Sequence, residues 1–439
     1  MTYTIEKVTT LIGARRYGDR DGNVGFILTD SRSLCFPEET LFFALKSERN
    51  DGHNYIPELY RRGVRNFVVS QVPKGYASDY PEANFLKVVN TLEALQRLAE
   101  RHRDEFNIPI VGITGSNGKT MVKEWLHQLL SPSMFVTRSP RSYNSQIGVP
   151  LSVWLLNEQT QVGVFEAGIS QPGEMLALRD IIQPTIAVLT YLGAAHQENF
   201  ESLEAKCREK IILFHDADTI VYNGDDKTVS GVVNEYKDYK GEKLFWSFRD
   251  TKAPFFVKNV EKKGNLSIIT YIYKGEEDSY SLPFIDEASV TNSIIAAVVS
   301  RRLGLSAEEL DKRMALLEPV AMRLEVKEGQ HGCTLINDSY NSDINSLDIA
   351  LDFMSRRPDH KGRRHTLILS DIFQSGESAK DLYHEVSDLC RKRGVVKFIG
   401  IGPQLCSQSD EIQISEKFFF SNVEEFIDSE VFKSLRDEV

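Results

Sequence analysis

The hydrophobic residues of the first hundred positions fall in short runs that polar segments separate. The runs at 25–28 and 66–69 have the length of strands, while apolar residues at every third or fourth position predict a helix that begins near Leu92. A charged stretch over 100–105 follows, and we expect it to be a linker that ends at Pro109. The pattern predicts a small mixed α/β region at the start of the chain.

From position 110 onward the expected strands are apolar throughout, as at 162–165, 186–189 and 220–222, and helical patterns lie between them. Strands that are covered on both faces have this composition, so we expect a parallel sheet flanked by helices. An alternating segment over 250–285 interrupts the sheet and predicts antiparallel strands, and a helix is expected over 290–303.

A second alternation of strands and helices occupies the last part of the chain. We expect strands at 334–336, 366–369 and 396–399, with a helix over 346–354 between the first two. The sequence contains no internal repeat, so the pattern as a whole predicts an α/β protein with one antiparallel addition.

Composition and charge narrow the class of protein. The chain has 439 residues, of which 41% are hydrophobic and 26% are charged, and these values are typical of a folded globular protein. Its net charge of −11 disfavours binding to nucleic acid or to an anionic membrane surface. Five cysteines are scattered without a Cys-x-x-Cys pair, and neither a signal-peptide pattern nor a membrane-spanning run is seen. We therefore expect a cytoplasmic protein with reduced thiols, no membrane span and no nucleic-acid partner.

The segment 110–120, with the sequence IVGITGSNGKT, joins an apolar strand to a glycine-rich turn and a helix. Such a turn lets successive backbone N–H groups and the helix N-terminus face an anion. The lysine can reach terminal phosphates, and the hydroxyl group after it can bind magnesium. The common P-loop spacing would place a glycine where this chain has Ile113. The candidate nucleotide-binding residues are Gly115, Ser116, Asn117, Gly118, Lys119 and Thr120.

This variant of the loop resembles that of the Mur ligases, the ATP-dependent amide-forming enzymes of peptidoglycan precursor synthesis. Further strings resemble motifs of the same family, in the same order and over nearly the whole chain. These strings are DSR at 30–32, DGH at 51–53, NSQIGVP at 144–150, FEAG at 165–168, NGDD at 223–226, RLE at 323–325 and NDSYN at 337–341.

The resemblance implies an α/β fold with the three-domain Mur ligase architecture, in which a central P-loop parallel sheet precedes a Rossmann-like C-terminal domain. It implies a UDP-sugar-binding domain over 1–103, an ATP-binding domain over 104–312 and a ligase domain over 313–439. In this family the third domain continues to a strand with a Lys-Gly-Ser/Ala-Arg string and then to a helix. We do not recognise either element in the sequence up to Val439. We therefore expect a truncated third domain, and a longer polypeptide in which an alanine racemase follows the ligase.

Enzymes of this family join an amine to a carboxylate that ATP has activated as an acyl phosphate. The NDSYN string resembles the branch whose substrates are UDP-N-acetylmuramoyl-tripeptide (UDP-MurNAc-tripeptide) and D-alanyl-D-alanine. The third residue of the tripeptide, lysine or diaminopimelate, stays open, and we expect a monomer. The alternatives are another Mur-type ligase with a different amino-acid substrate, a folylpolyglutamate- or cyanophycin-type ligase, and an inactive nucleotide-binding fragment. The DSR region argues against the second of these, because those ligases lack the uridine-nucleotide domain.

By the same resemblance, Thr120 and Glu166 bind one Mg²⁺, while His196 and a carbamylated Lys210 serve a second. Lys210 lies 14 residues after His196, which is the family's spacing, and Lys206 is the competing position one helical turn earlier. Carbamylation replaces a cation that repels Mg²⁺ with a bidentate anion. The expected catalytic residues are Lys119, His196 and Lys210.

The remaining expectations concern the nucleotide base and the sugar substrate. Asn292 is expected to begin a helix and to contact adenine, and a hinge after Leu303 is expected to let the third domain close. The residues of that domain expected at the nucleotide are Arg323, Asp338, Tyr340 and Asn341. The UDP-MurNAc-peptide is expected to bind through Ser31, Arg32, Asn144, Ser145 and Gln146.

Overall fold

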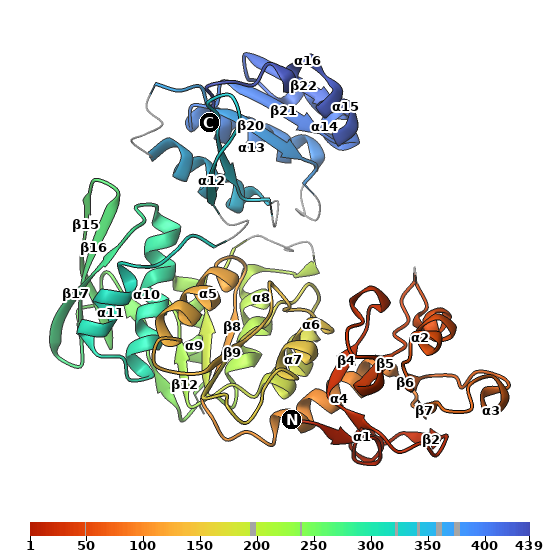
Figure 1. Cartoon of the computed structure of the whole chain (residues 1–439). Helices are drawn as coiled ribbons and strands as arrows, with labels where there is room; N and C mark the ends of the chain where they lie inside the picture. Colours follow the sequence, from red (N-terminus) through yellow and green to blue (C-terminus); the bar gives the residue numbers. More distant parts are fainter. Residues whose placement is uncertain are drawn as a thin grey trace. The chain divides into compact units, whose positions relative to one another are not determined.

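The computed structural model describes residues 1–48, 50–193, 199–237, 239–320, 324–339, 343–356, 362–372 and 378–439. It contains two compact units, and each is described by itself. The first consists of Met1–Gly112, Met134–Ile169 and Gly173–Thr185, and the second of Ile113–Ser133, Ser170–Pro172 and Ile186–Val439. Helices and strands alternate along most of the chain (Figure 1), which confirms the predicted α/β class.

A five-stranded sheet with the order β2-β7-β6-β5-β4 forms the N-terminal part of the first unit. Its strands are β2 (Arg15–Tyr17), β4 (Phe26–Leu28), β5 (Thr40–Phe43), β6 (Asn66–Val69) and β7 (Asn84–Lys87), and only the β2–β7 pair is antiparallel. The other elements are α1 (Ile5–Ile12), α2 (Ile56–Arg61), α3 (Tyr76–Asp79), α4 (Thr91–Arg103) and the pair β1 (Tyr3–Thr4) and β3 (Asn23–Val24).

Strand β5 and the residue after it show how this sheet is buried on both faces. Leu41 and Phe43 belong to a core that includes residues of α1 and α4, while Phe42 and Ala44 pack on the other face with residues of α2. Burying a large apolar side chain stabilises the fold by about 1.5–3 kcal/mol. Because alternate residues of the strand are buried on opposite sides, its sequence is continuously apolar.

The charged stretch at 100–105 is not a linker, because α4 continues through it to Arg103. Arg103 is buried, and its guanidinium group donates to the main-chain oxygens of Ile182 and Gln183, each at 3.0 Å. These carbonyls lie at the end of α7 (Glu174–Ile182), a part of the same unit. The charge is therefore satisfied inside the protein, and the stretch as far as Arg103 belongs to a packed helix.

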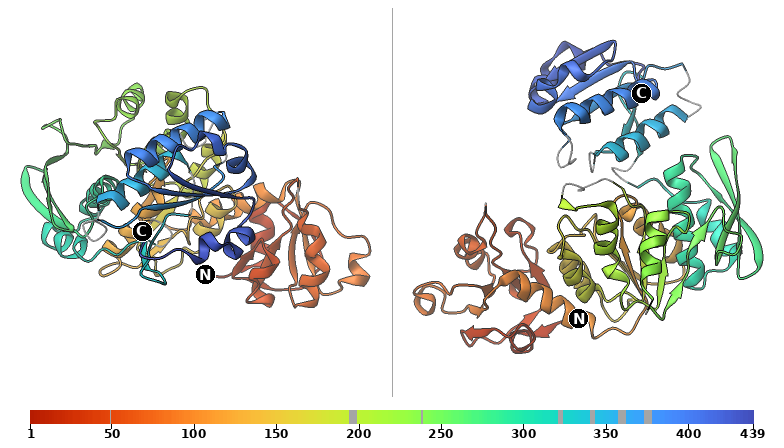
Figure 2. Two further views of the ribbon diagram at one scale, coloured as in Figure 1. Left: turned by 90° about the horizontal axis from the view of Figure 1, so that it is seen from above. Right: turned by 180° about the vertical axis from the view of Figure 1, so that it is seen from behind.

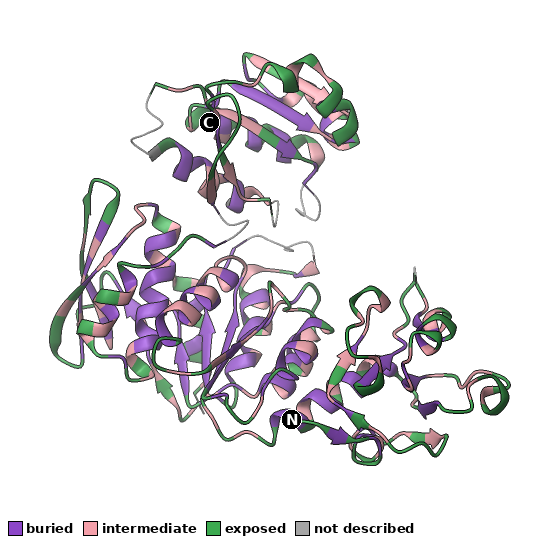
Figure 3. Cartoon of the chain, in the orientation of Figure 1, coloured by how far each residue is buried: buried purple, intermediate pink, exposed green. Residues whose placement is uncertain are grey.

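A six-stranded sheet of order β13-β12-β11-β8-β10-β9 has strands in both units, and β8 (Ile110–Thr114) contributes residues to each. In the first unit, β9 (Val136–Arg138) and β10 (Val162–Glu166) pair in parallel. In the second, β11 (Ile186–Leu189), β12 (Thr219–Val221) and β13 (Glu242–Lys243) do the same. The expected parallel sheet is confirmed for these pairs, and Figure 3 shows its strands buried. The helices of this region are α5 (Lys119–Leu130), α6 (Gly148–Val153), α8 (Leu203–Lys210) and α9 (Lys227–Glu235).

The segment 250–285 forms antiparallel strands, as predicted: β15 (Phe255–Lys263), β16 (Leu266–Tyr273) and β17 (Glu276–Leu282), with the short β14 (Trp246–Ser247) parallel to β15. The helix α10 (Glu287–Arg302) follows them. The expectation that Asn292 begins this helix is wrong. Asp286 is the N-cap and accepts the backbone N–H of Ser289, so Asn292 lies in the second turn of the helix.

The hinge expected after Leu303 stays a prediction, but the residues that follow Leu303 are packed against other elements. The next helix, α11 (Ala307–Met314), packs against β17 and α5. The indole N–H of Trp125 donates to the main-chain oxygen of Glu318 at 3.1 Å, and the side-chain oxygen of Gln128 accepts the Glu318 N–H at 2.9 Å. The chain is therefore held to α5 as far as Glu318.

The C-terminal part contains an antiparallel pair and a three-stranded parallel sheet. The pair is β18 (Glu325–Glu328) and β19 (Thr334–Asn337), and the sheet has the order β20 (Thr366–Ser370), β21 (Lys397–Ile401) and β22 (Glu416–Phe420). Helices α12 (Ile344–Arg356) and α13 (Ala379–Lys392) lie side by side and share a core with these strands (Figure 2). The short helices are α14 (Pro403–Ser407), α15 (Val423–Asp428) and α16 (Glu430–Lys433). In the described part of the chain, no helix has the length and apolar character needed to span a membrane.

Candidate active site

The loop between β8 and α5 requires glycine at two positions. Gly115 has a φ of +145° and Gly118 a φ of +88°. A Cβ atom at Gly115 would lie 2.0 Å from Oγ1 of Thr190, and one at Gly118 would lie 2.4 Å from Oδ1 of Asn292. Any side chain at these positions would strain the backbone and meet a neighbour. The glycines therefore let the chain make a tight turn in close contact with two other elements.

Hydrogen bonds fasten this loop to the segment that follows β11. The backbone N–H of Ser116 donates to the Tyr191 oxygen at 2.6 Å, and the Thr190 hydroxyl donates to the Asn117 oxygen at 2.6 Å. The Ser116 hydroxyl donates to the oxygen of Gly193 and accepts its N–H, each at 3.0 Å. The loop thus has a fixed shape in front of the N-terminus of α5, which is the arrangement that binds an anion.

Three lysines surround the loop. Nζ of Lys119 lies 2.8 Å from the main-chain oxygen of Gly115, and Nζ of Lys210 lies 3.3 Å from the same oxygen. Nζ of Lys206 lies 2.5 Å from the oxygen of Gly193. Lys206 is 1% and Lys210 3% exposed, so α8 turns both side chains into the protein. The ammonium groups of Lys119 and Lys206 beside a glycine loop suit a polyphosphate ligand.

Both candidates for carbamylation are therefore buried at this loop. Burial, together with the ammonium groups of Lys119 and Lys206, lowers the pKa of Lys210 well below its ordinary value. A lysine in such a place loses its proton readily, and the neutral amine is the form that reacts with CO₂. The choice of Lys210 over Lys206 stays a prediction.

The structure brings the loop residues 115–120, Lys210 and Asn292 together in the second unit. Thr120 is buried in the first turn of α5, and Nδ2 of Asn292 lies 3.3 Å from the sulfur of Met121. Asn292 therefore reaches the end of the phosphate loop although it does not begin its helix.

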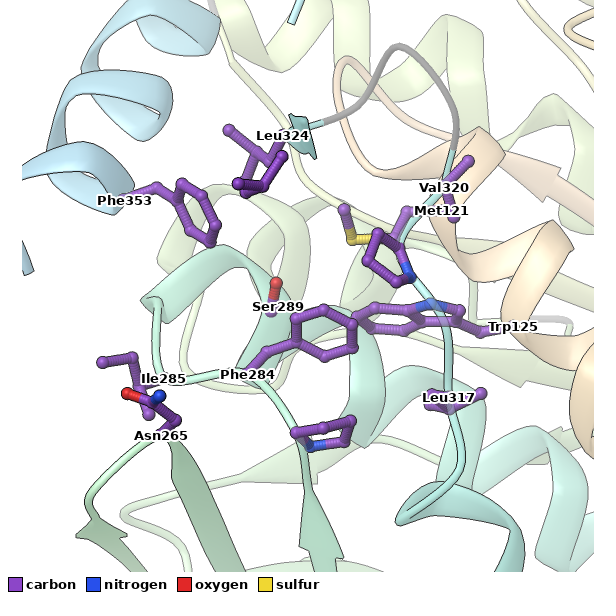
Figure 4. A pocket seen from close by; sticks show the side chains of 13 residues that line it. Met121, Trp125, Asn265, Phe284, Ile285, Ser289, Leu317, Val320, Leu324 and Phe353 are labelled. Carbon is purple, nitrogen blue, oxygen red and sulfur yellow. The ribbon is translucent and has the colours of Figure 1, made fainter. Parts of the chain in front are cut away.

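A cavity of about 240 Å³ lies beside α5 (Figure 4). The ring centres of Trp125 and Phe284 are 5.3 Å apart in a stacked arrangement, and Met121, directly after Thr120, forms part of the wall. Apolar and aromatic walls of this kind suit a flat ring better than a charged group. The other lining residues are Asn265, Pro283, Ile285, Ser289, Leu317, Pro319, Val320, Leu324, Val326 and Phe353.

Glu166 and Asn144 meet in the first unit. Glu166 ends β10 and is buried, and the amide nitrogen of Asn144 lies 3.4 Å from its carboxylate. A Cβ atom on Gly168 would lie 2.9 Å from the amide group of Asn144. The side chain of Gln146 is used differently, because it accepts from Gln96 of α4 at 2.9 Å and donates to the Glu174 oxygen at 3.0 Å. The hydroxyl of Ser145 accepts the N–H of Gly148 at 3.2 Å.

The predicted uridine-binding residues lie in a short 3₁₀ turn of the first unit, Ser31–Ser33. Asp30 caps the turn and binds the guanidinium group of Arg32 at 2.6 Å, which lowers the pKa of Asp30 to about 2. The Arg32 side chain is 87% exposed. In the nearby DGH string, Nδ1 of His53 binds Asp51 at 2.6 Å and Nε2 of His53 accepts the N–H of Ser70 at 3.1 Å.

Four predicted residues lie outside the described part of the chain: His196, Arg323, Tyr340 and Asn341. Of their neighbours, Asp338 is described, and its carboxylate accepts the N–H of Leu324 at 3.2 Å. Among the described residues, no group of three or more His, Cys, Asp and Glu side chains is arranged to hold a metal ion.

Sequence reasoning did not find Thr190 and Gly193, which hold the phosphate loop. The available signal was the position of Thr190 directly after the apolar run at 186–189. Two strands of one parallel sheet present their carboxyl ends at the same edge, so residues that follow such runs meet there.

Comparisons with known proteins show which proteins this chain is similar to. Residues 113–300 match the Mur ligase middle domain. The UDP-N-acetylmuramoyl-tripeptide–D-alanyl-D-alanine ligase of Bacillus subtilis is 28% identical over 82% of this chain and 76% of its own length. The Escherichia coli ligase of the same name is 24% identical over 95% of this chain and 90% of its own length.

Solved structures show the same fold. A crystal structure of MurF from Acinetobacter baumannii superposes with a TM-score of 0.83 at 22% identity, covering 97% of this chain and 91% of its own. The structure of MurF from Thermotoga maritima in complex with ADP gives a TM-score of 0.76 at 22% identity. The match covers 94% of this chain and 91% of the T. maritima chain. Residues 113–300 therefore match the Mur ligase middle domain, and the chain as a whole is similar to MurF ligases in sequence and in fold.

Proposed function

We propose that the protein is an ATP-dependent ligase that joins D-alanyl-D-alanine to UDP-MurNAc-tripeptide in peptidoglycan precursor synthesis. The observation that carries the proposal is the fixed glycine loop with Lys119 and Lys206 beside it, an arrangement that suits a polyphosphate. The substrates are taken from the names of relatives that match 82% to 96% of this chain.

The reaction has two steps. A carboxylate oxygen of the tripeptide attacks the γ-phosphorus of ATP, and ADP leaves. The amine of D-alanyl-D-alanine then attacks the carbonyl carbon of the acyl phosphate, and phosphate leaves as the amide forms. Phosphoryl transfer of this kind depends on positioning and on neutralising charge. We assign these tasks to the ammonium group of Lys119 and to the N-terminus of α5.

Magnesium bound with the nucleotide would neutralise further phosphate charge. We propose that the Thr120 hydroxyl and the buried Glu166 carboxylate serve this ion, since both are hard oxygen donors. We propose two magnesium sites, the second served by His196 and a carbamylated Lys210. Lys210 fits that role only in the carbamylated form, because an ammonium group has no lone pair for a metal.

The division into domains over 1–103, 104–312 and 313–439 and the cytoplasmic location belong to the same proposal. A ligase of the folylpolyglutamate type is less well supported. The structure of an FPGS mutant from L. casei gives a TM-score of 0.55 over 75% of this chain, against 0.83 over 97% for MurF of A. baumannii.

The decisive experiment measures ADP formation with ATP, magnesium, D-alanyl-D-alanine and UDP-MurNAc-tripeptide that carries either lysine or diaminopimelate. We expect ADP only when all components are present, together with a product of the mass of the pentapeptide. Turnover with a single amino acid in place of D-alanyl-D-alanine would indicate another Mur-type ligase. ATP binding without turnover under any of these conditions would indicate an inactive nucleotide-binding module.

A further inference from the structure

Helix α10 is in direct contact with the phosphate loop. Oδ1 of Asn292 is so close to Gly118 that a Cβ atom there would lie 2.4 Å away, and Nδ2 of the same residue lies 3.3 Å from the sulfur of Met121. Asn292 is 7% exposed, and α10 packs along α5 (Figure 1). A small rotation of α10 about its axis would therefore move Asn292 against the loop or away from it.

One hydrogen bond links this part of α10 to the antiparallel sheet. The hydroxyl of Tyr280, in β17, lies 3.0 Å from the hydroxyl of Ser293, the residue directly after Asn292. Ser293 donates its own proton to the Val290 oxygen at 2.7 Å, so Tyr280 is the donor in the pair. Tyr280 is 1% exposed, and this burial raises the pKa of its hydroxyl, which therefore stays protonated.

We propose that Tyr280 is a positioning residue of the nucleotide site: through Ser293 it fixes the rotation of α10 and so holds Asn292 against Gly118. The inference rests on the proposed ATP-dependent function. If this inference is correct, the antiparallel sheet contributes to nucleotide binding although none of its strands belongs to the phosphate loop. The turn that begins α10 supports the same placement, since the buried Asp286 accepts the Ser289 N–H at 2.7 Å.

The test compares Tyr280→Phe with Tyr271→Phe. Tyr271 lies in the neighbouring strand β16 and is also buried, but its hydroxyl has no hydrogen-bond partner among the described residues. ATP affinity is measured by titration calorimetry, and KM and kcat by ADP formation. We expect Tyr280→Phe to weaken ATP binding about tenfold, the size of one lost hydrogen bond, with kcat changed less than twofold. We expect Tyr271→Phe to leave ATP affinity unchanged.

Ser293→Ala removes the same bond from the other side and should reproduce the effect, and the double variant should bind ATP no worse than either single variant. Unchanged ATP affinity in Tyr280→Phe and in Ser293→Ala would overturn the inference. The proposed function would not be affected by that result, provided that the wild-type protein turns over its substrates. An equal rise of KM for ATP and for UDP-MurNAc-tripeptide would also overturn it, because that result indicates general loosening. A wild-type protein that binds no ATP would refute the proposed function and, with it, this inference.

Discussion

At the scale of single residues, Lys119 is the side chain on which phosphoryl transfer should depend most. Its ammonium group lies over the oxygens of Gly115 and Ser116, at 2.8 and 3.1 Å, and can turn to a phosphate without moving the backbone. Lys119→Ala should lower ADP formation by roughly 10²–10³-fold, because charge on the transferring group loses its neutralising partner. The melting temperature should not change. Lys312→Ala, which removes an exposed lysine of α11, is the control, and an equal loss there would contradict the assignment.

Lys210 should be carbamylated. Its Nζ shares the Gly115 oxygen with Lys119, and Lys206 is buried one turn away, so a third ammonium group would add repulsion that a carbamate removes. Lys210→Ala should reduce activity by about 10²-fold or more, and acetate or formate should restore part of it. Lys210→Arg should stay inactive, because a guanidinium group is always a cation.

The direct measurement for Lys210 is the mass of the peptide that contains it, which should include an added carboxyl group. Lys206→Ala is the matched variant, because it removes a lysine of the same helix and of similar burial. Full activity in Lys210→Ala together with loss in Lys206→Ala would assign the carbamate to Lys206 instead.

The residues of the phosphate loop could be predicted because they are consecutive in the sequence, so a local motif is enough to identify them. The partners that hold the loop could not be predicted in this way. Thr190 and Gly193 are distant from the loop in sequence, and they become its neighbours only through the order of the strands in the sheet. Chemistry that depends on the packing of separate elements is not visible in local spacing.

At the scale of elements, apolar periodicity located most strands and helices, and the errors arose where charged or polar residues were taken as exposed. Arg103 looked like part of a linker, yet its guanidinium group binds the carbonyls at the end of α7. Helix α10 begins earlier than the apolar pattern predicts, because its first turn is polar and is capped by Asp286, which accepts the N–H of Ser289.

The connection between α11 and β18 should depend on α5. Gln128→Ala removes the acceptor for the Glu318 N–H and should destabilise this connection by about 1 kcal/mol. We expect faster tryptic cleavage in the segment after Glu318, measured by the appearance of the C-terminal fragment. Gln128→Glu keeps an acceptor oxygen and should cleave at the wild-type rate. Equal cleavage rates in wild type and Gln128→Ala would show that this bond does not restrain the connection.

At the scale of the whole molecule, the three-domain division stays a prediction, and the compact units suggest how to test it. Residues of α4 pack against α6 and α7 within the first unit, so deleting residues 1–100 would cut α4 and expose the surface it covers. A failure of that deletion to bind substrate would therefore not identify the binding region. A substitution on an exposed residue separates recognition from folding.

Arg32 provides that substitution. Its side chain is 87% exposed and its ion pair with Asp30 lies at the surface, where such pairs contribute about 0–1 kcal/mol to stability. If the first 103 residues bind the UDP-sugar, Arg32→Ala should raise KM for UDP-MurNAc-tripeptide by about tenfold, since a charge-assisted hydrogen bond is lost. KM for ATP and the melting temperature should stay the same. Arg61→Ala, at the end of α2, removes another exposed arginine and should change none of these values. An unchanged KM for the UDP-sugar in Arg32→Ala would place its recognition elsewhere in the chain.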